Sequence, residues 1–157
     1  MAFEFDRTIV GQEFDRTVFP PVTEAQIVAY ARAYGETNPL YTDPQAAKRG
    51  PFGGLVGPPT FVFRLRGRNF MPKKLPEELG RRGFDAGKDL EVGVPVRPGD
   101  VLTSATSVHD LYEKTGRSGT MVFLVLRTTV TNQRQETVAI VDQRMMFRPP
   151  GSGSKER

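Results

Sequence analysis

The second half of the sequence limits the possible folds most strongly, because it reads as consecutive β-strands joined by short turns. The segment "DLEVGVPV" alternates apolar and polar residues and is followed by the turn "RPGD". Three longer segments come next, at residues 101–112, 120–131 and 137–147, and they are rich in β-branched or apolar residues. Consecutive strands with short connections pair antiparallel. The sequence therefore predicts an antiparallel meander.

The first half of the chain carries helix signals instead. Thr23 is a candidate N-cap, Gln26 stands at the third position of a capping box, and Gly35 ends the helix. A short helical turn is predicted over residues 43–50, where Pro follows Asp. An apolar stripe recurs at helical spacing along the first helix and consists of Ile27, Val28, Tyr30, Ala31 and Tyr34.

A middle helix is predicted to begin at Pro58-Pro59, because proline is tolerated in a first turn, where amides have no intrahelical acceptor. Its apolar residues Phe61, Val62 and Leu65 extend it toward Phe70. A strongly curved antiparallel sheet wrapped around this central helix would bury the apolar faces of both helices. The expected fold class is therefore α+β.

Length and composition suggest one soluble domain, over residues 1–148, with a disordered tail rich in Pro, Gly and Ser at 149–157. The chain has no cysteine, and its one histidine, His109, cannot supply a histidine-rich metal site, so no metal and no cofactor are expected. No signal peptide is evident, and no apolar run approaches the ~18 residues of a membrane span. A cytoplasmic location away from the membrane is expected.

The loop "GETNPLY", residues 35–41, resembles the MaoC-like hydratase and dehydratase family, whose loop reads roughly G-D-x-N-P-x-H. The following "FGGLVGPPTF" resembles the family's entrance to its central helix, and "VPVRPGDVL" resembles a later element that leads into a strand. The resemblance covers residues 15–148 and is nearest to the N-terminal, FAS1-like dehydratase branch. It implies a single hot-dog domain.

In active members, the resemblance implies, the Asp and His of this loop activate water for addition across the double bond of a trans-2-enoyl thioester. The reverse reaction dehydrates an (R)-3-hydroxyacyl thioester. A backbone N–H at the start of the central helix polarises the thioester carbonyl. Base, acid and oxyanion donor together make a coherent site.

Three positions depart from that pattern. Glu36 replaces the aspartate, which moves the carboxylate out by one methylene, and an error near ~1 Å costs on the order of 100-fold in rate. Tyr41 replaces the histidine, and tyrosine, with an ordinary pKa of ~10, is mainly a proton donor. Pro59 has no N–H where the oxyanion donor is expected, although the amides of Thr60 and Phe61 leave room for a shifted site. The three changes favour a subunit that has kept the fold and lost the chemistry.

The candidate substrate-binding residues implied by the resemblance are Asn38, Pro39, Gly57, Thr60 and Phe61. An Asx-type turn at Asn38, followed by a proline, shapes the loop whether or not the site is catalytic.

A basic segment that begins within the predicted middle helix is a candidate site for phosphates of CoA or phosphopantetheine, or for an acidic carrier protein. The candidates are Arg64, Arg66, Arg68, Lys73 and Lys74. A solvated helix face is the simpler interpretation and is favoured. A nucleic-acid role is not expected, because Phe61, Phe63 and Phe70 have the spacing of core residues.

The leading hypothesis is an accessory subunit that binds an acyl thioester, of CoA or acyl carrier protein, within an (R)-specific enoyl hydratase or 3-hydroxyacyl dehydratase. The partner would be a second hot-dog chain, in a homodimer or a heterodimer. Two alternatives stay open: an active homodimeric enoyl-CoA hydratase that uses Glu36 as base and Tyr41 as donor, and a non-catalytic acyl-CoA-binding module.

Overall fold

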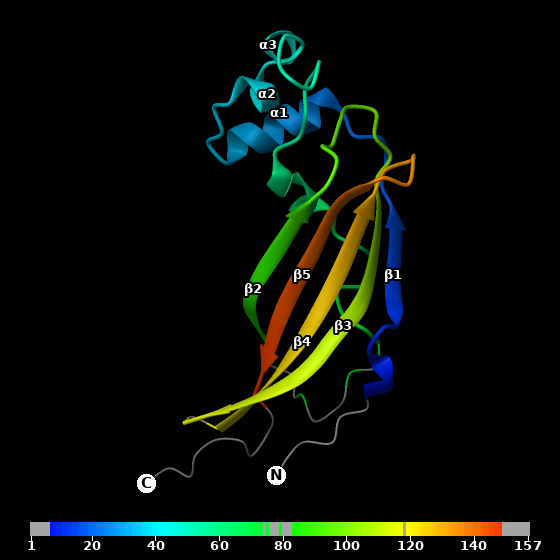
Figure 1. Ribbon diagram of the computed structural model, residues 1–157, viewed down its shortest axis with the longest axis vertical. Coiled ribbons are helices and arrows are strands. Elements are labelled where there is room, and N and C mark those ends of the chain that lie inside the picture. Colours follow the sequence, from blue (N-terminus) through cyan, green and yellow to red (C-terminus); the bar gives the residue numbers. More distant parts are fainter. Residues whose placement is uncertain (1–6, 74, 76–78, 80–82, 118, 149–157) are drawn as a thin grey trace.

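Within the described residues, a five-stranded antiparallel sheet forms the body of the molecule, with the α-helices gathered at one end of it (Figure 1). The computed structural model describes residues 7–73, 75, 79, 83–117 and 119–148. The strand order is β1-β3-β4-β5-β2. The strands are β1 (Glu13–Val18), β2 (Gly83–Val92), β3 (Thr103–Gly116), β4 (Gly119–Thr131) and β5 (Thr137–Phe147). Lys74 and the predicted tail at 149–157 lie outside the described residues.

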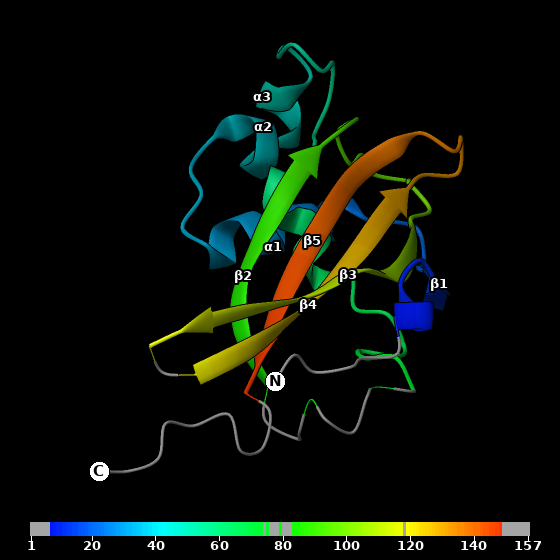
Figure 2. The same ribbon diagram turned by 60° about the horizontal axis from the view of Figure 1, so that its bottom comes forward.

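The predicted meander is confirmed as β3, β4 and β5. β3 pairs with β4 from Thr103↔Thr131 to Gly116↔Gly119, and β4 pairs with β5 along most of its length. The β3–β4 hairpin continues past the last residues of β1 and β5 that pair with it, and its tip projects from the sheet at the lower left of Figures 1 and 2. Over most of their length β3 and β4 are therefore paired on both sides, whereas at the hairpin tip they pair only with each other.

Two strands differ from the prediction. β1, a short and mostly polar segment, was not among the predicted strands, and it pairs with β3 at one edge. β2 ends at Val92, so the predicted strand at 89–96 is wrong for its last residues. The regular pairing stops there, although the amides of Gly93 and Val94 still donate to the carbonyls of Val138 and Thr137. The backbone of Gly93 passes so close to Thr137 that a Cβ would lie 2.0 Å from the Thr137 carbonyl oxygen. Only glycine fits such an approach.

The first helix, α1 (Glu24–Ala33), has the predicted capping box: Thr23 Oγ1 accepts from the Gln26 amide, and the Gln26 side chain accepts from the Thr23 amide. Ile27 and Ala31 are fully buried, as expected of the stripe. The assignment of Tyr34 to that stripe is wrong, since α1 ends at Ala33 and Tyr34 is 75% exposed.

The central helix is much shorter than predicted. It is a 3-10 helix, η2 (Pro59–Arg64), and the predicted extension to Phe70 is wrong. Leu65 leaves helical geometry with a ψ of 85°, and the next residues make tertiary hydrogen bonds in place of helical ones. The amide of Asn69 donates to Asp15 at 2.8 Å, and that of Arg68 donates to Thr17 Oγ1 at 3.3 Å. Contacts with β1 therefore override the helical spacing.

Three other helical segments are short: η1 (Arg7–Ile9), α2 (Pro39–Thr42) and α3 (Pro44–Ala47). The predicted turn at 43–50 is confirmed in α3, where Asp43 Oδ1 accepts from the amides of Gln45 and Ala46. No helix in the described part of the chain is long and apolar enough to cross a membrane.

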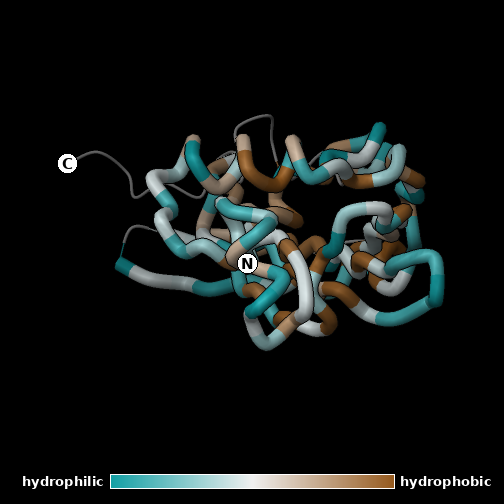
Figure 3. The backbone as a smooth tube through the Cα atoms, turned by 90° about the horizontal axis from the view of Figure 1, so that it is seen from above, coloured by the Kyte–Doolittle hydropathy of each residue, from teal (hydrophilic) through white to brown (hydrophobic). Residues whose placement is uncertain are grey.

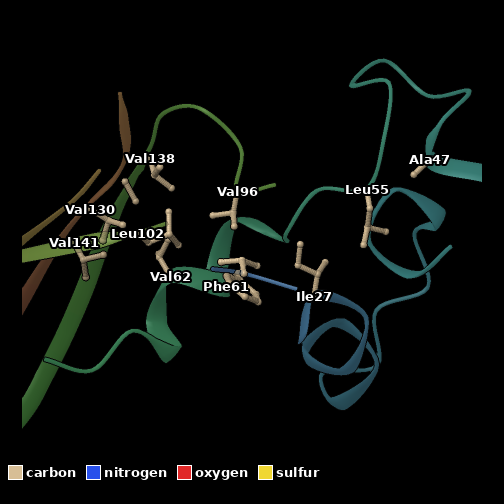
Figure 4. Packing of buried hydrophobic residues seen from close by; sticks show 12 residues of the cluster. Ile27, Ala47, Leu55, Phe61, Val62, Val96, Leu102, Val130, Val138 and Val141 are labelled. Atoms are coloured by element: carbon tan, nitrogen blue, oxygen red, sulfur yellow. The ribbon is translucent and has the colours of Figure 1, made fainter. Parts of the chain in front are cut away.

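Phe61 of η2 joins the helical end to the sheet. It is fully buried and lies between Ile27 of α1 and Val62, with strand residues such as Val130 beyond (Figure 4). Tyr30 meets its ring edge-on at 5.4 Å between centroids. In the end-on view of Figure 3 the hydrophobic stretches gather toward the interior and the outer loops are mostly hydrophilic. The curved sheet therefore closes on a short helix, in the expected α+β arrangement.

Replacing Phe61 by alanine should lower the free energy of unfolding by about 3–5 kcal/mol, because a large side chain with no exposed surface is removed from the core. Phe63→Ala is the matched control, since Phe63 lies in the same helix and is 39% exposed. Urea denaturation followed by circular dichroism measures both. Equal losses for the two variants would contradict this account of the core.

Asp142 and Arg127 face each other on β5 and β4, with hydrogen bonds of 2.7 and 2.6 Å between guanidinium and carboxylate. These bonds hold the pKa of Asp142 below its ordinary value. The pair therefore stabilises the fold above the unfolded-state pKa of ~3.9, and this contribution is lost as pH falls through the folded-state pKa.

The difference in unfolding free energy between wild type and Asp142→Asn should accordingly be largest near neutral pH and shrink below about pH 4. Urea denaturation over a pH series measures it. The same substitution in an Arg127→Met background is the control and should lose most of that pH dependence. A difference independent of pH would contradict the assignment to this ion pair.

Candidate functional site

The loop that resembles the catalytic loop of hydratases is folded back on itself at Glu36. Glu36 Oε1 accepts from the backbone amides of Thr37 and Asn38, both at 2.9 Å. Asn38 then caps α2, because its Oδ1 accepts from the Leu40 amide at 3.0 Å and Pro39 occupies the first helical position. The Asx-type interpretation of Asn38 is confirmed. The Glu36 carboxylate thus satisfies two amides of its own loop.

Tyr41 lies on the other side of this loop, in the wall of a small pocket of about 150 Å³. The pocket is lined by Tyr41, Phe52, Val56, Gly57, Pro58, Pro59, Val62, Val92, Gly93, Val94, Pro95, Val96 and Val138. Tyr41 is the one titratable residue in this lining. The loop residues Glu36, Asn38 and Pro39 are not part of it. The pocket is therefore an apolar cavity with one hydroxyl group.

The start of the central helix forms one wall of this pocket, and two of its amides, those of Gly57 and Phe61, are engaged in backbone hydrogen bonds. Pro58 and Pro59 have no N–H. The Gly57 amide donates to the Val96 carbonyl at 2.9 Å, and the Phe61 amide donates to the Pro58 carbonyl at 2.8 Å. The shifted oxyanion site considered for Phe61 therefore has no donor there, because that N–H is used within the turn.

The remaining sequence candidates around η2 lie apart from the small pocket. Phe61 is in the core, and Thr60 is exposed, with its carbonyl accepting from the Tyr30 hydroxyl at 2.7 Å. Burial raises the pKa of Tyr30, whose hydroxyl is used to tie α1 to η2. Of the candidate substrate-binding residues, only Gly57 lines this pocket.

Sequence reasoning missed the opposite wall of the pocket, residues 92–96, and the lip at Phe52. The guanidinium of Arg97 donates to the Phe52 carbonyl at 2.8 Å and so joins the lip to the wall. The available signal was "VGVPVRPGD", an apolar run in which Gly93 and Pro95 interrupt a strand pattern. This run resembles a family element, but tertiary structure alone brings it to the same pocket as Tyr41.

A second and larger pocket, of about 600 Å³, lies between segment 62–70 and the sheet. The segment contributes Val62, Phe63, Leu65, Arg66, Gly67, Arg68, Asn69 and Phe70, with Tyr34 of α1's C-terminal end. The strands contribute Asp85, Lys88, Thr106, Leu126, Thr128, Val130, Val141 and Gln143. Val62 lines both pockets and is thus the boundary between them. We refer to the two as the Tyr41 pocket and the sheet-face pocket.

The basic candidates are distributed over this second region. Arg66 and Arg68 line the sheet-face pocket, whereas the Arg64 guanidinium lies 4.9 Å from the centre of the Phe61 ring. Lys73 is exposed. His109 is exposed on β3. Within the described residues, no group of His, Asp and Glu side chains has an arrangement suited to a metal ion.

Comparison with known proteins gives the family of this chain. The family model of the FAS1-like dehydratase domain region matches residues 8–141. The UPF0336 protein of Parafrankia sp. (strain EAN1pec) is 39% identical over 140 residues, which cover 82% of this chain and 86% of that protein.

Solved structures give the same assignment of fold. The MaoC-like dehydratase of Rhodospirillum rubrum superposes with a TM-score of 0.68 at 29% identity, covering 94% of this chain and 99% of that one. A chain of the HadBC (3R-hydroxyacyl-ACP dehydratase) complex of Mycobacterium tuberculosis superposes with a TM-score of 0.65 at 23% identity, covering 88% and 96%. The sheet topology, the short central helix and these matches together show that the chain belongs to the FAS1-like dehydratase family and has its hot-dog fold.

Proposed function

We propose that this chain is a non-catalytic subunit that binds an acyl thioester for a hydratase or dehydratase formed with a second hot-dog chain. The observation that carries the proposal is the chemistry of the Tyr41 pocket, whose lining, among the residues that the structure describes, contains no carboxylate and no histidine. Hydration of an enoyl thioester requires one group to take a proton from water and another to give a proton to the substrate carbon. A tyrosine hydroxyl ordinarily supplies only the second function near neutral pH.

The hydrogen bonds of Glu36 support the same proposal. Its carboxylate accepts two amides of its own loop, so using it as a base would break bonds that hold the loop in shape. Glu36 is therefore proposed as a structural group of the loop, and the catalytic carboxylate is assigned to the partner.

The two pockets together offer a path for an acyl thioester. Ligand pockets for small molecules usually measure about 300–1,000 Å³. The Tyr41 pocket is smaller than this range and the sheet-face pocket lies within it. We assign the thioester end to the Tyr41 pocket and the acyl chain to the sheet-face pocket, past Val62. Apolar strand residues, Leu126, Val130 and Val141, are the wall that a chain of methylenes would contact.

A second chain is supported by the exposed edge of the sheet. β2 is one of the two edge strands, and apart from half-buried Leu90 all its residues are exposed. Phe84 and Val92 have 58% and 52% of their surface exposed. An uncovered edge strand with apolar residues is a template for pairing with another strand. HadBC, whose chain has a similar fold, is a complex, and we propose that a second hot-dog chain with an intact Asp-His loop binds at this edge.

The purified chain alone should bind decanoyl-CoA, measured by isothermal titration calorimetry, and should not hydrate crotonyl-CoA or trans-2-decenoyl-CoA. Hydration is followed as loss of the enoyl-thioester absorbance. Mixing with a hot-dog chain from the same genome that carries an intact Asp-His loop should give turnover. Turnover by this chain alone, abolished by Glu36→Gln, would refute the proposal and establish the active homodimer. Binding without turnover for every such partner would leave the simple acyl-CoA-binding module as the function.

Substitution of Glu36 separates the structural role from the catalytic one. Glu36→Gln keeps a side-chain oxygen for the two amides and should change the unfolding free energy little. Glu36→Ala removes that acceptor and should lower it by about 1 kcal/mol, as loss of a helix cap does. Thermal denaturation gives the stability, and turnover of the reconstituted complex gives the catalysis. A Glu36→Gln complex that folds normally but loses turnover would contradict the structural assignment.

A further inference from the structure

Asp15 is a buried acid on the edge strand β1. Only 4% of its surface is exposed, and neighbours on the same strand, Glu13 and Arg16, are exposed and paired with each other. The pairing of β1 with β3 shifts register between Glu13 and Asp15, which is the local irregularity of a β-bulge. Bulges re-aim side chains along a strand. Burying a carboxylate costs free energy unless it is well hydrogen-bonded. The hydrogen-bond partners of Asp15 therefore indicate what it does in the structure.

These partners come from the segment that follows η2. Asp15 Oδ1 accepts from the backbone amide of Asn69 at 2.8 Å and from its side-chain amide at 3.1 Å. Asp15 Oδ2 accepts from the Thr17 hydroxyl at 3.0 Å, and Thr17 Oγ1 in turn accepts from the Arg68 amide at 3.3 Å. Two consecutive residues of the segment are thus attached to β1, across more than fifty positions of sequence.

Gly67 completes the attachment by its lack of a side chain. A Cβ at this position would lie 2.0 Å from Asp15 Oδ2, so no other residue can occupy it while the carboxylate keeps its place. Gly67 is not among the glycines with positive φ, so the requirement is one of space. Asp15, Gly67 and Asn69 therefore form one unit, which we call the Asp15 clasp.

The segment attached by the clasp is the outer wall of the sheet-face pocket. Leu65 to Phe70 all line that pocket, opposite Leu126, Val130 and Val141 of the sheet. A longer central helix would take the same residues along another path, and the helix ends at Arg64. The clasp thus replaces helical hydrogen bonds as the element that sets the distance between the wall and the sheet.

We propose that Asp15 is a positioning residue that holds segment 65–70 as the wall of the sheet-face pocket and thereby determines how long an apolar chain the protein accepts. The ligand part of this inference rests on the proposed function; the structural part does not. Asp15 is not in the lining of either pocket and acts through Asn69 and Gly67.

Asp15→Ala should release the wall, and Gly67→Ala should displace it by filling the space beside the carboxylate. Asp15→Asn keeps the oxygen that accepts both Asn69 donors and should largely preserve the position of the wall. Glu13→Gln is the matched control, an exposed acid on the same strand. The first readout is limited trypsin cleavage after Arg66 and Arg68, with the sites identified by mass spectrometry. Loss of hydrogen bonds to a charged acceptor should raise cleavage on the order of tenfold or more in Asp15→Ala.

The second readout is the affinity for butyryl-CoA and decanoyl-CoA, measured by calorimetry on the full chain. Asp15→Ala and Gly67→Ala should weaken the binding of decanoyl-CoA more than the binding of butyryl-CoA. Asp15→Asn should bind both thioesters with affinities close to those of the wild type. If Asp15→Ala does not fold, judged by circular dichroism, Gly67→Ala and Asn69→Ala provide the same comparison.

Unchanged cleavage in all folded variants would overturn the clasp. Increased cleavage with equal effects on both ligands would overturn its role in chain length. A wild type that binds neither thioester would refute the proposed function and the ligand part, while the cleavage rates would still decide whether the clasp holds the wall.

Discussion

The ladder between β3, β4 and β5 is the interaction on which the rest of the structure depends. β4 is hydrogen-bonded on both sides, and its inward residues belong to two separate clusters. Val130 packs with the helical end around Phe61, whereas Leu124 packs with Leu111 and Ile9 near the opposite end. Neither cluster could form if the register of β4 shifted by one residue, because every side chain would change face. Both pockets use this same scaffold as their fixed side.

Features determined by neighbouring residues could be predicted from the sequence. The capping box of Thr23 and Gln26 needs only four residues, and β5 spans the segment predicted for it. β1 could not be recognised in the same way, because it is short and polar and its central residue, Asp15, makes sense only beside Asn69. The same long-range contact explains the wrong prediction for the helix: the spacing of Phe61, Leu65 and Phe70 is helical, but the chain after Arg64 is held by β1.

The candidate site shows the same division. The turn at Asn38 follows from local geometry and was predicted, whereas the place of Tyr41 in a pocket wall depends on residues 92–96 and could not be inferred from the loop motif. The orientation of the Glu36 carboxylate could not be inferred, since a glutamate can reach either a substrate or the amides of its own loop. The structure resolves this through two hydrogen bonds. At the start of the central helix, Pro58 and Pro59 have no N–H, and the amides of Gly57 and Phe61 donate to backbone carbonyls of the protein itself. The loop and the helix start of this hot-dog domain thus use these groups to hold the fold.

The β3–β4 hairpin has a further consequence for how the molecule opens. Its last pairs, Thr115↔Thr120 and Gly116↔Gly119, lie beyond the reach of β1 and β5, and two glycines flank the turn. An isolated two-stranded ribbon is only marginally stable in water. Amide hydrogen exchange should therefore form a gradient along these two strands, fast at the tip and slowest near Val130, where three strands and the Phe61 cluster meet. The molecule would thus open first at this tip, before the end of the sheet where Val130 and Phe61 pack together.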